Sequence, residues 1–307
     1  MRSPSPLSSV DDPPPQPVPG QTAVLRSPRC GTTGFSSRRV ALIGHNTLRE
    51  AVRQKLLLFL GMLGLALVVS SQWFREFDFG ASELKFLADC GFGAMAFFGS
   101  SLVIAATAQL FFSEIENRTA LTLLAKPVWR AEFILGKFAG IVALAGIFCA
   151  LLTTLLAAII WVRETEIMRL VPEAFPGGRA AHYSNLFFAG ALQWLKLSVL
   201  GALMTLVASF AQTQLFTVAT GFFVVVICHL QHLAQAAYSR GAGTFGSVVA
   251  APLTLIFPDF QVFTIADSLA ATDAPAWFDL VRICGYGGGY MVVACALAAW
   301  SFRHREI

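Results

Sequence analysis

The residues best suited to polar chemistry gather in a short charged segment, residues 113–137, between two long apolar runs. The segment opens with the carboxylates of Glu114 and Glu116 and continues to the basic side chains of Lys126 and Arg130. Both signs of charge on one connector favour polar contacts with another protein. The alternative is an ordinary basic loop that only sets the orientation of its neighbours in a membrane.

A nucleotide-binding role for this segment is not supported by its glycines. Gly136 and Lys137 form a Gly-Lys pair, but Ala131 stands where a phosphate-binding loop needs its first glycine. Phe138 stands where that loop needs Ser or Thr. We therefore expect no catalytic residue, no cofactor and no enzyme activity in this chain.

A metal site is not expected either. His229 and His232 are three residues apart and would share a helical face. A protein zinc site needs three or four ligands, and no carboxylate or cysteine completes the set at helical spacing unless Cys228 is counted. The six cysteines contain no Cys-x-x-Cys pair, so we interpret them as small apolar residues.

The composition places these residues in a membrane protein. Of the 307 residues, 56% are hydrophobic and 13% are charged, against about 45–50% and about 25% in soluble domains. The formal net charge of +4 is small and unevenly placed, which is typical of topology signals and not of nucleic-acid binding. We expect an all-α integral membrane protein that contacts the lipid bilayer and no nucleic acid.

Six apolar runs approach the roughly 20 residues that a transmembrane helix requires. They cover residues 56–74, 86–112, 138–162, 186–210, 215–233 and 280–302. Lys and Arg are more frequent before the first run, in the charged segment and after the last run than in the alternating loops. Because the basic side faces the cytoplasm, we expect both termini and the charged segment there, in a multi-pass protein of a bacterial-type cytoplasmic (inner) membrane.

The region before the first run divides into two parts. Residues 1–37 are rich in Pro, Ser and Gly, which predicts a disordered cytoplasmic tail or an extension from an upstream start codon. Residues 38–307 would form the transmembrane domain. Within residues 39–55, four apolar side chains can share one helical face, which predicts an interfacial amphipathic helix. These four are Val40, Ile43, Leu48 and Val52.

The charged segment itself contains helix signals. Ser113 followed by Glu116 fits a capping box, which predicts that a short helix starts there. Pro127 cannot continue that helix, and a second helix would start near Val128 and enter the third apolar run. These signals together predict a short cytoplasmic helix that is joined to a membrane span at each end.

The region from Glu114 to Gly140 resembles the cytoplasmic loop of permeases in the ABC-2 family of ATP-binding-cassette transporters. The resemblance rests on Glu114 and Glu116, Leu123-Leu124, Lys126-Pro127-Val128-Trp129-Arg130, and Gly136-Lys137. Weaker similarities to the same family cover residues 46–53, 257–260 and 302–306, so the resemblance extends over about residues 40 to 307. Arg118 departs from it, because a Gly is expected there.

The resemblance implies that the short helix is a coupling helix that docks on a separate ATPase subunit. The docking residues would be Glu114, Glu116, Leu123, Leu124, Lys126, Pro127 and Arg130. It also implies two copies of an ABC ATPase subunit and a second permease, identical or different. The substrate is unidentified, and export is the common direction in the family. The alternatives are a secondary transporter and a membrane anchor or assembly protein that transports nothing.

Two charges fall within the predicted spans. Asp89 and Lys196 form a candidate intramembrane polar pair, because a charge in a membrane span is by default a functional hypothesis. The alternatives are that Lys196 extends to the membrane interface and that Asp89 pairs with Lys85 one helical turn away.

One loop is apolar without being long enough to span. Residues 252–270 are interrupted by Pro258 and Asp259. They predict a re-entrant or interfacial segment.

Overall fold

The computed structural model describes residues 36–76, 83–116, 129–170, 183–239, 257–263 and 277–303. All regular elements in these ranges are helical, and the ranges contain no strand, so the expected all-α fold class is confirmed. The elements are α1 (Ser37–Arg53), α2 (Lys55–Ser70), η1 (Ser71–Glu76), α3 (Glu83–Glu116), α5 (Arg130–Leu170), α6 (Tyr183–Phe210), α7 (Gln214–Ser239), η3 (Phe260–Phe263) and α10 (Trp277–Arg303). Residues 1–35 of the predicted tail lie outside the described residues.

Six of these helices are long and apolar enough to cross a membrane, which confirms the predicted number of spans. They cover Lys55–Trp73, Leu84–Ser113, Ala131–Leu170, Tyr183–Phe210, Gln214–Gln231 and Leu280–Phe302. The largest difference from the prediction concerns α5, which has 41 residues. At 1.5 Å per residue it is roughly 60 Å long, about twice the thickness of the hydrocarbon core of a bilayer.

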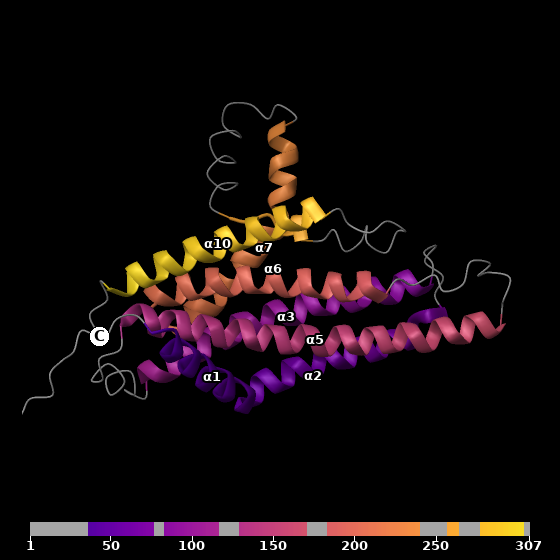
Figure 1. Cartoon of the computed structure of the whole chain (residues 1–307), viewed down its shortest axis with the longest axis horizontal. Coiled ribbons are helices and arrows are strands. Elements are labelled where there is room, and N and C mark those ends of the chain that lie inside the picture. The colour runs from indigo at the N-terminus through magenta and orange to yellow at the C-terminus, as the bar shows by residue number, and fades with distance from the viewer. Residues whose placement is uncertain are drawn as a thin grey trace, which may run out of the picture. The chain divides into compact units, whose positions relative to one another are not determined.

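Helices α3, α5 and α6 form the centre of the bundle. Each of the three packs against the other two, while α2 packs mainly on α3, α7 on α3, and α10 on α6. Figure 1 shows α6 between α10 and α5. The central helices supply fully buried side chains such as Met95, Leu152 and Leu200.

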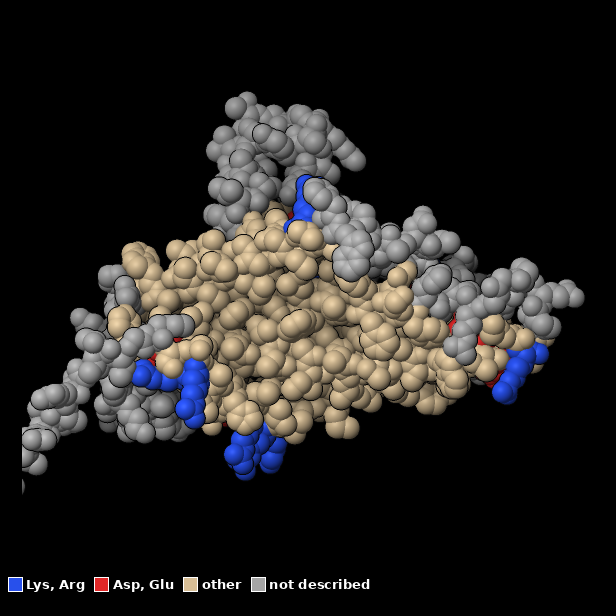
Figure 2. Space-filling model, viewed as in Figure 1, with Lys and Arg blue, Asp and Glu red and all other residues tan. Residues whose placement is uncertain are grey.

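The outer helices present apolar side chains on their free faces. Met62 of α2, Phe223 of α7 and Val292 of α10 are each at least 70% exposed. Figure 2 shows a broad surface without charged groups, with Lys and Arg at its margins. Such a surface is suited to lipid, because apolar side chains lose nothing by facing hydrocarbon chains.

Helix α1 is separate from the first span. Gln54 lies between α1 and α2 in an extended conformation (φ −80°, ψ 121°), so the chain turns there. The buried residues of α1 are Gly44, Thr47 and Ala51. Val52 of the predicted apolar face is 46% exposed, and the interfacial position of α1 stays a prediction. Helix α1 packs on α5, and small residues suit that close contact better than bulky ones.

The described part of the loop before α10 enters the bundle. Phe260 and Phe263 of η3 are 1% exposed, and η3 contacts both α6 and α7. Irregular backbone is tolerated at membrane depth only where protein or a cavity surrounds it. Protein therefore surrounds η3, a 3₁₀ helix of 4 residues.

Candidate functional site

The charged segment divides between described and undescribed residues. Leu123, Leu124, Lys126 and Pro127 lie at 117–128, outside the described residues. Glu114 and Glu116 belong to the last turn of α3, and Arg130 is the first residue of α5. The structure therefore describes the two ends of the predicted coupling helix and not the helix itself.

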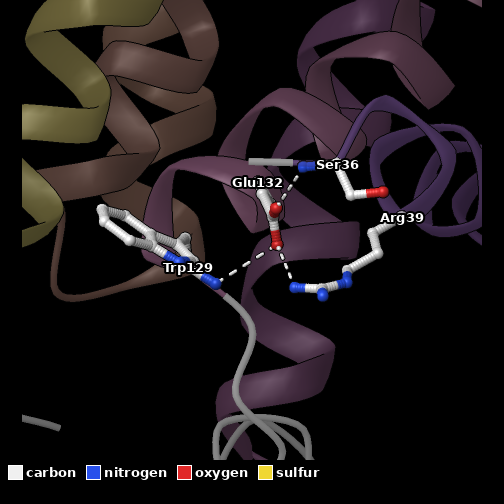
Figure 3. A network of polar contacts seen from close by, with 4 residues as sticks. All are labelled: Ser36, Arg39, Trp129 and Glu132. Atoms are coloured by element: carbon white, nitrogen blue, oxygen red, sulfur yellow. Dashed lines mark hydrogen bonds and ion pairs between the residues drawn. The ribbon is translucent and has the colours of Figure 1, made fainter. Parts of the chain in front are cut away.

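The carboxylate of Glu132 organises the start of α5 (Figure 3). This side chain is fully buried and accepts a hydrogen bond from the backbone N–H of Ser36 at 2.8 Å. It also accepts from the backbone N–H of Trp129 at 3.3 Å and from Nη1 of Arg39 at 3.4 Å. Glu132 thus joins the residue before α1, the first turn of α1 and the residue before α5.

The contact with Trp129 is one half of a capping box. Trp129 precedes the first residue of α5, and Glu132 is the third residue of that helix, so its carboxylate reaches back to a backbone donor that the helix leaves unpaired. The capping box predicted at Ser113 is wrong, because α3 continues unbroken through Ser113 to Glu116. The predicted restart near Val128 agrees with a helix that begins at Arg130.

Two glycines of α5 allow α1 to approach closely. A Cβ atom added to Gly136 would lie 2.6 Å from Cβ of Ile43, and one added to Gly140 would lie 2.6 Å from Cβ of Thr47. Both distances are shorter than carbon atoms tolerate without movement. On the other side of the contact, a Cβ at Gly44 would lie 3.2 Å from the carbonyl oxygen of Gly136. Backbone therefore meets backbone where α1 crosses α5.

A second polar contact joins α1 to the end of α3. The hydroxyl of Ser113 donates to Oε1 of Glu50 at 3.1 Å. Ser113 is the residue at which the charged segment begins, so α1 contacts both ends of that segment, one through Glu50 and the other through the Glu132 network.

Lys137 joins the two helices that flank the charged segment. Its side chain is fully buried, and Nζ donates to the carbonyl oxygen of Leu110 in α3 at 2.7 Å. Nζ also lies 5.7 Å from the centroid of the Phe133 ring, which is within the range of a cation–π contact. Gly136 and Lys137 thus serve helix packing: the glycine faces α1 and the lysine faces α3.

These contacts make one mechanical unit of α1, α3 and α5 beside the undescribed segment 117–128. Charge-assisted hydrogen bonds to buried groups resist separation, and the glycine contact leaves no room for the helices to slide freely. A force applied to the segment between Glu116 and Trp129 would therefore reach three helices together.

The structure describes both members of the candidate intramembrane pair. Lys196 is 4% exposed and does not extend to an interface. Its Nζ lies 3.3 Å from Nε2 of His229 and 5.4 Å from the centroid of the Phe260 ring. Asp89 is exposed on α3, and its pairing with Lys196 stays a prediction.

The described part of the chain contains no cluster of three or more His, Cys, Asp or Glu side chains that could hold a metal ion. His229 instead contacts Lys196 through one ring nitrogen and the carbonyl oxygen of Val225 through the other, at 2.9 Å.

Sequence reasoning missed Glu132 and Glu50. A signal for Glu132 was present, because a Glu three residues after Trp129 and shortly after Pro127 fits a helix start. No local signal pointed to Glu50, because its partner Ser113 is 63 residues away in the chain.

Comparison with protein-family models gives a match over most of the chain. A family model described as "ABC-2 family transporter protein" matches residues 40–307. The match includes α1 from Val40 onward, all six candidate spans and both ends of the charged segment. No curated protein matches the chain.

Proposed function

Because the chain belongs to the ABC-2 family of transporter proteins, we propose that it is the permease subunit of an ATP-binding-cassette transporter driven by a separate ATPase subunit. The chain is a multi-pass membrane protein of a transport family, and permeases of this family are not themselves the ATPase. The proposal adds the partner, the docking surface and the orientation.

The proposed docking surface is the segment between α3 and α5. Its contact residues would be Glu114, Glu116, Leu123, Leu124, Lys126, Pro127 and Arg130. The observation that carries this proposal is the Glu132 network: a buried carboxylate fixes the place where the segment enters α5 and ties it to α1. A segment anchored in this way is suited to transmit force and not only to connect two spans.

The proposed mechanism follows from the length and contacts of α5. Two ATPase subunits would close on ATP and press on the docking segments of two permeases, this chain and an identical or different second one. Because α5 is continuous over 41 residues and is joined to α3 through Lys137, the displacement would tilt both helices as a unit. The permeases would then rock about their shared interface and move the substrate, outward in the family's common case.

The proposed orientation puts α1, the docking segment and both termini in the cytoplasm, with the protein in a bacterial-type inner membrane. The distribution of Lys and Arg supports it. In this arrangement α1 would lie along the cytoplasmic interface, because its exposed face carries Arg38, Arg49 and Arg53. The predicted division into a tail of residues 1–37 and a transmembrane domain of residues 38–307 would move to residue 36, because Ser36 bonds to Glu132 and Ser37 begins α1.

The deciding experiment is co-purification with an ATPase. The full chain is expressed with its neighbouring genes, solubilised and captured, and ATP-binding proteins in the eluate are identified by mass spectrometry. We expect a stoichiometric ATPase subunit. Reversing the charge of the segment with Lys126→Glu and Arg130→Glu should lower its recovery at least about tenfold, because rim charges at an interface steer and orient binding.

The matched control is Arg169→Glu, which reverses an exposed charge in the last turn of the same helix and should leave recovery unchanged. If the unaltered chain brings down no ATP-binding subunit, the chain is a secondary transporter or an anchor and the proposal fails.

A further inference from the structure

Lys196 is a buried cation halfway along a membrane-spanning helix. It lies roughly 20 Å from either end of α6 at 1.5 Å per residue, and its side chain is 4% exposed. Intramembrane charges are costly, and where they occur they commonly mark the path of a substrate or ion.

Lys196 contacts two other elements of the bundle. His229 of α7 offers Nε2 at 3.3 Å, and its Nδ1 lies 2.9 Å from the carbonyl oxygen of Val225. A carbonyl oxygen only accepts hydrogen bonds, so Nδ1 carries the ring proton and Nε2 presents a lone pair to the ammonium. On another side of the ammonium, the Phe260 ring of η3 lies 5.4 Å away.

Aromatic rings continue from this point across the bundle. Successive ring centroids from His229 through Phe260, Phe263 and Tyr286 to Tyr290 are 5.5, 6.4, 6.1 and 5.0 Å apart. These rings belong in turn to α7, η3 and α10. The cation therefore sits at one end of a continuous apolar and aromatic layer.

Asp259, the residue before η3, is held by its own loop. Oδ1 of Asp259 accepts a hydrogen bond from the backbone N–H of Gln261 at 2.9 Å, and the backbone N–H of Asp259 donates to the Tyr286 hydroxyl at 2.9 Å. Asp259 thus helps to set the position of η3, whose Phe260 ring covers the ammonium.

We propose that Lys196, with His229 beside it, forms a site inside the membrane for the acidic head group, a carboxylate or a phosphate ester, of an amphiphilic substrate. The ammonium would bind the acidic group, His229 would orient the ammonium, and the aromatic layer would contact the apolar body. The Phe260 ring occupies the face of the ammonium that the acidic group takes, so η3 moves aside when the substrate enters. This inference rests on the proposed transport function and names its substrate class.

The test uses the full chain in nanodiscs of phosphatidylcholine and a palmitate probe that carries a photoreactive diazirine and an alkyne. Illumination should label peptides of α6, α7 or η3. Unlabelled palmitate and hexadecyl phosphate compete as carboxylate and phosphate sources, and hexadecanol serves as the uncharged control. We expect one or both acids, and not the alcohol, to suppress labelling; the stronger competitor identifies the preferred head group.

Variants separate binding from a purely structural role. Lys196→Gln should lower labelling about tenfold or more, the loss typical of one charged hydrogen bond, while Lys196→Arg retains it. Lys85→Gln, which removes an exposed lysine of α3, should have no effect. Phe260→Leu removes the competing ring and should raise labelling severalfold.

Equal competition by hexadecanol, or full labelling of a Lys196→Gln variant, would overturn the inference. Lower labelling of the Phe260→Leu variant would also count against the inference, provided that the variant elutes as a monodisperse protein. In that case the Phe260 ring would be needed for the structure of the site and would not compete with the substrate. Recovery of the ATPase subunit with Lys196→Gln stays normal under the inference. Loss of the ATPase from the unaltered chain refutes the proposed function, whatever the labelling shows.

Discussion

The carboxylate of Glu132 accepts a hydrogen bond from the backbone N–H of Ser36, 96 residues earlier in the chain, at 2.8 Å. One buried side chain thereby serves the beginning of two helices, because it also accepts from the N–H of Trp129 ahead of α5. The first N–H groups of a helix have no partner within it, so both helix starts depend on the same carboxylate.

Removal of this carboxylate should weaken the junction. Glu132→Ala leaves two backbone donors without their charged acceptor, and each such bond is worth about 1.5–3 kcal/mol. We expect the free energy of unfolding in detergent to fall by about 3 kcal/mol, measured by thermal or denaturant unfolding. ATP-driven transport should fall further than stability accounts for if the junction transmits force.

The control for that measurement is Glu166→Ala on the same helix. Glu166 pairs with Arg163 on an exposed surface, where an ion pair contributes about 1 kcal/mol or less. Equal losses for both variants would contradict a special role of Glu132.

The glycine contact predicts a steric effect with a defined rescue. In Gly140→Ala the new Cβ would lie 2.6 Å from Cβ of Thr47, and overpacking of this kind costs about 1–3 kcal/mol. Thr47→Gly removes the opposing atoms, so the double variant should recover part of the loss. The free energy of unfolding of all three variants measures this coupling.

A glycine with open space provides the comparison. At Gly288 of α10 an added Cβ meets nothing within 4 Å, so Gly288→Ala should be neutral or stabilise the helix by up to about 1 kcal/mol. If Gly140→Ala behaves in the same way, α1 does not pack on α5 as described.

The contact between Glu50 and Ser113 is suited to a double-mutant cycle. The single variants Glu50→Gln and Ser113→Ala and their combination should give a coupling energy of about 1 kcal/mol in unfolding. Ser101→Ala in the same helix, whose hydroxyl bonds only within α3 to the carbonyl oxygen of Phe97, should show no coupling to Glu50. Additive effects of Glu50→Gln and Ser113→Ala would exclude an energetic link between α1 and the end of α3.

The proposed orientation predicts the outcome of reporter fusions. Green fluorescent protein fused after Ile307 should fluoresce, and alkaline phosphatase at the same site should be inactive, because the C-terminus is proposed to be cytoplasmic. Alkaline phosphatase inserted after residue 175, between α5 and α6, should be active. The opposite pattern at both sites would invert the topology and place the docking segment on the wrong side for an ATPase.

The sequence alone determined the class of fold and the number of spans. Apolar runs of about 20 residues are dictated by the thickness of the bilayer and not by tertiary contacts, so the sixth span, Leu280–Phe302, agrees with its predicted limits. The family resemblance over about residues 40 to 307 also rested on local sequence, and the match to the family model confirms it.

Only the tertiary structure decided which polar residues meet. Glu132 lies in a segment that the sequence marks as charged and exposed, yet it is fully buried because donors from Ser36, Arg39 and Trp129 surround it. The fully buried residues of α1 are small, Gly44, Thr47 and Ala51, and hydropathy does not mark them as buried. Such contacts join residues far apart in the chain, and their energies depend on distance and burial that no local pattern records.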